Sequence, residues 1–223
     1  MGGHDDACRG ALDEIARVLD CRRIDGTDYL SHFLYLVAVL QSQNSGTKGA
    51  GLTGGIEQEK IWIDMLQAGS SAFHRAPPPG TTSTDDYDYY WESYPLSHKT
   101  IGWRGNGDLA LAWSKNPKGG RQRTRFESSI VVVVTRQPSP RSRSWDGIGQ
   151  GVYVIPVTAL TGVTLKANNK SDSIFAAEDV RRCLRESRNA GLHLPFSFDP
   201  ERGRSRCVSI WHAGPDAIRP VQS

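Results

Sequence analysis

An unbroken run of β-branched residues, Ile-Val-Val-Val-Val at 130–134, is the feature that most restricts how this chain can fold. A strand with one face in water alternates apolar and polar residues, whereas a strand covered on both faces is apolar throughout. The run therefore predicts a central strand that is buried on both faces of a sheet.

The first third of the chain has helical periodicity. Apolar residues recur at helical spacing in the segment 8–19, which places Cys8, Ala11, Leu12, Ile15 and Leu19 on one face. The apolar run 29–40 predicts a central helix, and residues 56–67 predict a third helix. Residues 44–55 are rich in Gly, Ser, Asn and Thr. We expect them to form a loop, and they lack the Gly-Lys-Ser/Thr spacing of a phosphate-binding loop.

The remainder of the chain is rich in strands. Alternating or continuous apolar patterns predict strands at 87–91, 96–103, 109–113, 130–134, 152–157 and 207–211. Ser173 is expected to cap a helix at 175–188 that ends at Gly191. This order of elements predicts an α/β or α+β fold, in which helices flank a mixed central β-sheet behind a helical N-terminal third.

Length and composition limit the class of protein. A chain of 223 residues can bury a core, so we expect a single domain over 1–223, with a helical part at about 5–67 and a sheet-containing part at about 85–223. No CxxC pair occurs among the four cysteines, and no secretory or membrane-spanning segment is evident. We expect a cytoplasmic protein with reduced thiols and no membrane partner, in which Cys8 is a small buried apolar side chain.

Charge is distributed unevenly along the chain, although the formal net charge is only +3. Residues 77–97 contain four acids and no Lys or Arg, whereas residues 115–144 contain eight Lys and Arg against the single acid Glu127. An acidic cluster beside a basic segment suits an active site that acts on a polyanion.

The acidic segment is followed by a strand with a lysine. Side chains alternate along a strand, so Asp86, Asp88 and Glu92 are expected to share one face, and Ser97 and Lys99 another. If the two strands pair, an acid can meet Ser97 and Lys99 across the sheet. A carboxylate there can bind Mg²⁺, and an ammonium group can position the attacking hydroxide.

This order of an acidic strand, a short gap and a strand with a lysine resembles the PD-(D/E)XK nuclease superfamily, which includes type II restriction endonucleases. The resemblance covers residues 56–134 and implies a restriction-endonuclease-like fold. It also implies that Asp88 or Asp86 binds the metal and that Lys99 is the catalytic lysine. Glu57 or Glu59, on the preceding helix, would be a supporting acid.

Two positions depart from the pattern of this superfamily. No Pro-Asp pair precedes the site, since Thr84 stands before Asp85. Ser97 occupies the position two residues before the lysine, where an acid is usual, so Glu92 or Glu127 is expected to replace that acid. The predicted catalytic set is therefore Asp88, Lys99, Ser97 and Glu92, and the predicted metal ligands are Asp88, Asp86, Glu92 and Glu57.

A second lysine, Lys115, competes with Lys99 for the catalytic role. It follows Asp108 at an odd separation, which places the two side chains on opposite faces of a regular strand. We therefore expect Lys115 to contact phosphate instead. The predicted DNA contacts come from the basic segment and are Lys115, Lys118, Arg121, Arg123 and Arg125.

Together these features predict a Mg²⁺-dependent endonuclease of restriction type that cleaves double-stranded DNA. We expect a homodimer, because two sites can cut the two strands of a symmetric target. Three alternatives remain open: a toxin-like transferase that acts on a nucleotide cofactor, a nucleic-acid-binding module without catalytic activity, and a metal-independent nuclease that uses His212 or Tyr residues.

Overall fold

The computed structural model describes residues 2–20, 29, 32–33, 35–36, 50–75, 88–101, 111–115, 128–135, 148–161, 163, 165–168 and 172–195. Contacts divide the chain into two compact units. The first unit joins Met1–Leu12 to Ala76–Phe196, and the second joins Asp13–Arg75 to Ser197–Ser223. A single domain over 1–223 stays a prediction.

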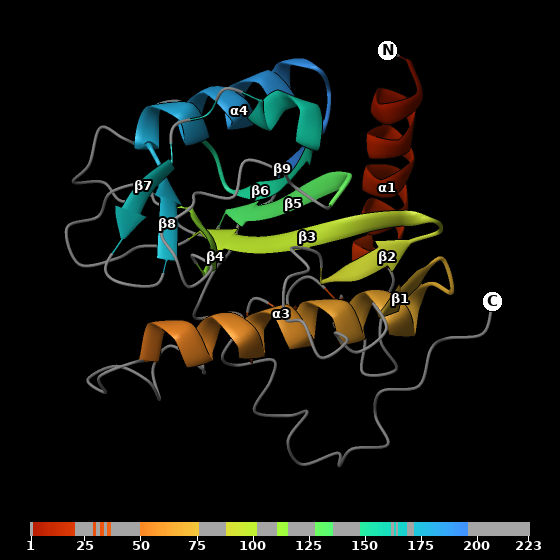
Figure 1. Ribbon diagram of the computed structural model, residues 1–223. Coiled ribbons are helices and arrows are strands. Elements are labelled where there is room, and N and C mark those ends of the chain that lie inside the picture. Colours follow the sequence, from red (N-terminus) through yellow and green to blue (C-terminus); the bar gives the residue numbers. More distant parts are fainter. Residues whose placement is uncertain are drawn as a thin grey trace. The chain divides into compact units, whose positions relative to one another are not determined.

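The first unit is built on a mixed β-sheet, drawn in Figure 1. Five strands follow one another in the order β2-β3-β5-β6-β9. They are β2 (Tyr89–Trp91), β3 (Tyr94–Ile101), β5 (Ile130–Thr135), β6 (Gly151–Pro156) and β9 (His193–Pro195). β3 and β5 are parallel, and the other neighbouring strands are antiparallel. The mixed sheet with helices that the sequence predicts is confirmed.

β5 is the central strand of this sheet. It lies between β3 and β6, and all six of its residues are buried. Val131 and Val133 belong to an apolar core that also includes Tyr153 and Ile155 of β6. Val132 and Val134 point to the opposite face and are also fully buried. The prediction of a strand covered on both faces is confirmed.

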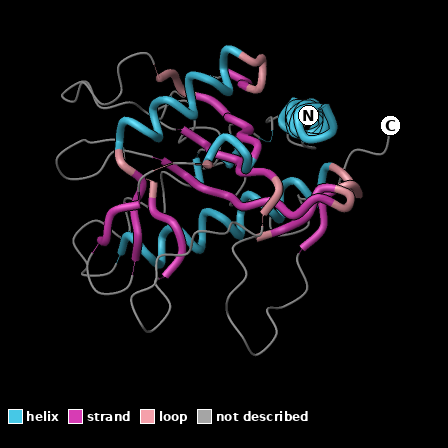
Figure 2. The backbone as a smooth tube through the Cα atoms, turned by 45° about the horizontal axis from the view of Figure 1, so that its top comes forward, coloured by secondary structure: helices cyan, strands magenta, loops and turns pink. Residues whose placement is uncertain are grey.

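Helix α4 (Ala177–Asn189) packs on one face of this sheet, as Figures 1 and 2 show. It buries Val180, Cys183 and Leu184 against Val133 and Ile155. These residues recur every three or four positions, which gives the helix one continuous apolar stripe.

The C-terminus of α4 is closed by a Schellman motif. The N–H of Leu192 donates to the carbonyl of Ser187 at 2.8 Å, and the N–H of Gly191 donates to that of Arg188 at 3.0 Å. Gly191 has φ +71°, a left-handed conformation that glycine adopts without a Cβ penalty. Gly191 therefore ends the helix as predicted. The predicted N-cap, Ser173, was wrong: the cap residue is Ala176, and Ser173 pairs with Trp113 inside a strand.

A second, three-stranded antiparallel sheet completes the first unit. Its order is β4-β8-β7, where β4 is Ala112–Lys115, β8 is Asp172–Phe175 and β7 is Leu165–Asn168. A short 3-10 helix, η2 (Val157–Leu160), directly follows β6. The strand predicted at 109–113 overlaps β4 at residues 112–113, and β4 belongs to this smaller sheet.

The second unit contains helix α3 (Ala50–Gly69) and strand β1 (Phe73–Arg75). Residues 13–20 of helix α1 (Gly2–Asp20) also belong to this unit. Val18 lies so close to Gly69 that a Cβ at position 69 would collide with it. The rings of Phe33 and Trp62 meet edge to face, with centroids 5.1 Å apart.

Three further predictions concern the helices and the last strand. The N-terminal helix is confirmed, and Cys8 is fully buried in it. The loop expected at 44–55 was partly wrong, because residues 50–55 already form the start of α3. Each glycine weakens a helix by about 1 kcal/mol relative to alanine but does not end it. The strand predicted at 207–211 lies outside the described residues.

Among the described helices, none has both the length and the apolar composition that a membrane-spanning helix needs.

Candidate active site

A tight hairpin joins β2 to β3 and positions the first candidate residues. Tyr89 pairs with Leu96, and Trp91 pairs with Tyr94, so that Glu92 and Ser93 form the turn. Glu92 has φ +51°, an uncommon conformation for a residue with a side chain.

The end of β2 at Trp91 corrects one prediction. Glu92 was expected to lie on the same strand face as Asp88. It lies in the turn instead, beyond the end of β2. Its side chain is also exposed to solvent. A role for Glu92 as a metal ligand stays a prediction, but the shared strand face no longer supports it.

Asp88 lies immediately before β2, beside Ser97 of β3. Its N–H donates to the carbonyl of Leu96 at 2.8 Å. Leu96 pairs with Tyr89, the residue after Asp88, and Ser97 directly follows Leu96. The hairpin therefore brings the Asp88 carboxylate within hydrogen-bond distance of the Ser97 hydroxyl.

Three groups of β3 converge on one oxygen of the Asp88 carboxylate, Oδ2. The backbone N–H of His98 donates to it at 2.6 Å, and the hydroxyl of Ser97 donates at 3.2 Å. The Lys99 ammonium forms an ion pair with the same oxygen at 3.8 Å. The side chains of Lys99 and Asp88 are 23% and 18% exposed, so solvent reaches the pair. The structure thus brings Asp88, Ser97 and Lys99 together.

Ser97 and Lys99 lie on the face of the sheet that α4 covers. They pair with Val131 and Val133, whose side chains belong to the core beneath α4. Ser97 is fully buried, whereas Lys99 remains partly exposed. The site therefore has a buried base at Ser97 and a side that is open to solvent at Lys99 and Asp88.

His98 points to the opposite face, as its position between Ser97 and Lys99 predicts. It is only 3% exposed, and its Nε2 lies 3.0 Å from the hydroxyl oxygen of Thr100. Burial, and secondarily the charge of Lys99, lowers the pKa of His98 to about 3. The imidazole is therefore neutral at physiological pH and is a packed residue. The contribution that sequence reasoning missed is its backbone N–H, because no residue type signals a main-chain donor.

The site fits a hard divalent cation in the chemistry of its donors. Mg²⁺ prefers oxygen ligands, keeps several waters and is held by one or two carboxylates. Asp88 supplies one carboxylate, and its Oδ1 makes no hydrogen bond to any described residue. Across the described ranges, no cluster of three or more His, Cys, Asp or Glu side chains is arranged to hold a metal ion.

The other predicted site residues lie in other parts of the chain. Glu57 lies on α3 in the second unit. Lys115 ends β4, which belongs to the smaller sheet, so Lys99 is the candidate lysine on the main sheet. The remaining predicted residues lie outside the described part of the chain, namely Asp86, Lys118, Arg121, Arg123, Arg125 and Glu127.

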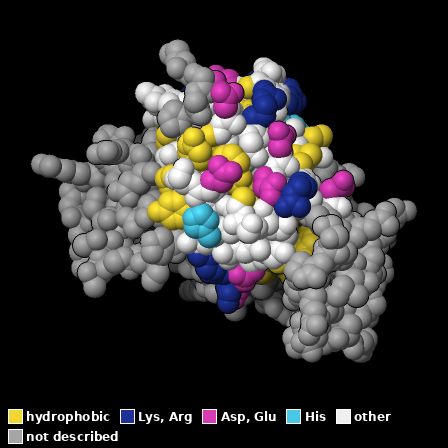
Figure 3. Space-filling view, turned by 90° about the vertical axis from the view of Figure 1, so that its right-hand side faces the viewer, with side chains coloured by type: hydrophobic (Ala, Val, Ile, Leu, Met, Phe, Trp, Pro, Cys, Tyr) yellow, Lys and Arg dark blue, Asp and Glu magenta, His cyan; other side chains and the backbone are white. Residues whose placement is uncertain are grey.

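On the face that Figure 3 shows, the described Lys and Arg side chains do not form a basic patch. Acidic side chains lie between the described Lys and Arg side chains there, so positive charge does not gather on it.

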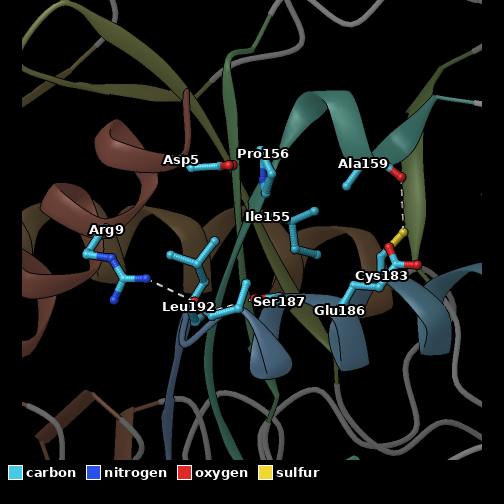
Figure 4. A pocket seen from close by; sticks show the side chains of 10 residues that line it. Asp5, Arg9, Ile155, Pro156, Ala159, Cys183, Glu186, Ser187 and Leu192 are labelled. Carbon is cyan, nitrogen blue, oxygen red and sulfur yellow. Dashed lines mark hydrogen bonds between the residues drawn. The ribbon is translucent and has the colours of Figure 1, made fainter. Parts of the chain in front are cut away.

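A pocket of about 200 Å³ lies elsewhere in the first unit, between α1, β6 and α4 (Figure 4). Ile155, Leu192 and Cys183 form much of its lining. Burial raises the pKa of Cys183 to about 11, so the thiol is not a nucleophile at neutral pH. Arg9 reaches the carbonyl of Ala190 at 3.0 Å. The pocket includes none of the candidate catalytic residues.

No protein-family model and no curated protein sequence matches this chain. Among solved structures, the chain is similar to a restriction endonuclease in complex with substrate DNA, with a TM-score of 0.43 and 15% sequence identity. The match covers 80% of this chain and 91% of the other. Similarity at this level is distant, and it assigns neither a family nor an activity to this protein.

Proposed function

We propose that this protein is a Mg²⁺-dependent endonuclease that cleaves double-stranded DNA at a specific site, as restriction enzymes do. The observation that carries the proposal is the Asp88–Lys99 pair, 3.8 Å apart and partly exposed at the end of the β2–β3 hairpin. A carboxylate and an ammonium group at one open site supply a ligand for a cation and a positive charge for a phosphate.

Each residue of the site has a defined role in this proposal. Asp88 holds the cation, and the cation supplies charge neutralisation and an activated water when it is bound. Lys99 stabilises the negative charge that develops on the scissile phosphate and orients the attacking water. The buried strand β5 fixes the backbone of Lys99 through the pairing of Lys99 with Val133. The glutamate that completes the site, whether Glu57, Glu92 or Glu127, is part of the proposal.

The partners follow from the reaction. The basic residues from Lys115 to Arg125 bind the DNA backbone, and two copies of the chain form a homodimer that cuts both strands. A homodimer places two Asp88–Lys99 sites on one duplex.

The test is cleavage of plasmid DNA by the purified protein with Mg²⁺ and with EDTA. We expect discrete bands with Mg²⁺ alone. Asp88→Asn and Lys99→Ala should each lower the cleavage rate by roughly 100-fold or more, because each removes charge stabilisation in the transition state. Asp64→Asn is the matched control: it removes a carboxylate that forms an ion pair with Arg75 in the second unit, and it should cleave at the wild-type rate.

The transferase and the binding module would each give a different result from the endonuclease. A nucleotide-dependent transferase would retain its activity in EDTA. A binding module would shift DNA in a gel without cutting it, and Asp88→Asn would leave that shift unchanged. Absence of cleavage on both methylated and unmethylated substrates would refute the endonuclease.

A further inference from the structure

The two oxygens of the Asp88 carboxylate have different surroundings. Oδ2 accepts hydrogen bonds from the backbone N–H of His98 and the hydroxyl of Ser97, whereas Oδ1 accepts none from the described residues. An ionised carboxylate offers about four lone-pair sites. The strand neighbours therefore occupy one oxygen and leave the other available.

The Ser97 hydroxyl has no other described hydrogen-bond partner than Asp88. Ser97 is fully buried on the face beneath α4, where its neighbours on β5 are valines. A buried hydroxyl without a hydrogen-bond partner at such a position would destabilise the fold. Its bond to Asp88 both satisfies the hydroxyl and gives the carboxylate a second fixed contact.

Two donors are needed to fix a carboxylate. The His98 N–H alone, at 2.6 Å, fixes the position of Oδ2 but leaves the carboxylate able to turn about that contact. The Ser97 hydroxyl donates to the same oxygen at 3.2 Å and gives the carboxylate its second contact. Lys99, at 3.8 Å, is too far for a hydrogen bond and contributes charge instead of orientation.

We propose that Ser97 is a positioning residue: with the His98 N–H, its hydroxyl holds Oδ2 of Asp88 so that Oδ1 is presented as the ligand atom for a divalent cation. This inference rests on the cation site of the proposed function. Hydrogen bonds to metal-binding carboxylates typically change metal affinity by 10–100-fold. Ser97 therefore has a role of its own at the position where the resemblance leads one to expect an acid.

The test measures cation binding without DNA. Mn²⁺ is titrated into the protein and followed by electron paramagnetic resonance, with Mg²⁺ as competitor. Asp88→Asn identifies the signal from this site. Ser97→Ala should weaken binding of Mn²⁺ about 10-fold. Ser97→Thr retains the hydroxyl and should bind within about twofold of wild type, since the hydrogen bond to the carboxylate is kept.

The matched control is Ser187→Ala. Ser187 is also a buried serine, and its hydroxyl donates to the carbonyls of Val154 and Leu192, away from the site. This change should lower the melting temperature and leave Mn²⁺ affinity unchanged. If Ser97→Ala does not fold, Ser97→Cys keeps the size of the side chain with a much weaker donor, and it should weaken binding in the same direction.

Three outcomes would overturn the inference: no Mn²⁺ signal that depends on Asp88, equal affinities for wild type and Ser97→Ala, or equally weakened binding in Ser97→Ala and Ser187→Ala. The cleavage assay separates this inference from the endonuclease. A cation site that depends on Ser97 in a protein that cuts no DNA would refute the nuclease and support the role of Ser97. Cleavage at the wild-type rate by Ser97→Ala would support the nuclease and refute the role of Ser97.

Discussion

At the scale of single residues, backbone and side chain of one position can serve different parts of the fold. The imidazole of His98 is buried on one face of β3. The backbone N–H of the same residue donates to Asp88 at the edge of the candidate site. Ser97 and Lys99, one residue to either side, point to the other face. Residue type predicted the two side chains that face Asp88, but not the main-chain donor between them.

His193 is a second histidine whose chemistry depends on its surroundings. Its ring stacks on Tyr153 with centroids 4.0 Å apart. It also lies so close to Gly151 that a Cβ there would collide with the ring, and Gly151 has φ +156°. Burial lowers the pKa of His193, and the charge of Arg188 lowers it further.

This shift predicts how stability depends on pH. The neutral ring is favoured in the folded state, so the unfolded state binds more protons below its pKa of 6.5. The stabilisation from His193 is therefore present above pH 6.5 and is lost as the pH falls below that value. His193→Phe keeps a ring against Tyr153 but cannot titrate. Between pH 7.5 and pH 5.5, the urea midpoint should fall less in this variant than in wild type. An identical fall in both proteins would contradict the assignment.

At the scale of elements, the β2–β3 hairpin determines the site. The pairing of Tyr89 with Leu96 brings Asp88, the residue before Tyr89, beside Ser97, so the register of two strands decides which carboxylate meets the lysine. A shift of one residue would turn every side chain of β2 to the other face.

Gly10 of α1 lets Trp91 of β2 pack closely. A Cβ at Gly10 would lie 2.6 Å from the ring of Trp91, so the absence of a side chain there leaves room for the ring.

The turn of this hairpin is strained at Glu92. Its φ of +51° costs a residue with a side chain about 1–2 kcal/mol, and glycine does not incur this cost. After the entropy that glycine loses on folding, Glu92→Gly should raise the free energy of unfolding by about 0.5–1 kcal/mol, measured by urea denaturation. Ser93→Gly, at a position without positive φ, should not stabilise the protein.

The same variant tests the predicted role of Glu92. Cleavage of DNA at the wild-type rate by Glu92→Gly would leave Glu57 or Glu127 as the glutamate that completes the site. A folded Glu92→Gly protein that no longer cleaves DNA would instead support Glu92 as a ligand.

At the scale of the whole molecule, charge should control DNA affinity. Replacement of Lys115, Lys118, Arg121, Arg123 and Arg125 by glutamine removes five positive charges from the basic segment. The slope of log affinity against log salt should become shallower by about 0.9 for each phosphate that the variant no longer neutralises, or by about 4.5 if all five residues bind phosphate. Fluorescence anisotropy with a labelled duplex at several salt concentrations measures this slope.

Arg182→Gln is the control for that experiment. Arg182 lies on α4 between Asp179 and Glu186, at 3.8 and 3.1 Å, so two acids already balance its charge. The slope should stay at the wild-type value. An unchanged slope in the fivefold variant would remove the basic segment from the DNA-binding surface.

The sequence by itself determined the elements whose patterns are long or unbroken. The valines of β5, the apolar stripes of α1 and α4, and the glycine that ends α4 each follow from local physics: side-chain periodicity, burial and backbone conformation. The mixed sheet with helices was therefore predictable. Sequence alternation also predicted that Ser97 and Lys99 share a face.

Only the tertiary structure decided which residues meet. The sequence does not show that β2 ends at Trp91, that β4 joins a separate sheet, or that Ser173 lies in a strand, because pairing between distant segments decides these points. The sequence offered several carboxylates near one lysine. Strand pairing brought Asp88 within 3.8 Å of Lys99, and the main-chain N–H of His98 holds one oxygen of its carboxylate.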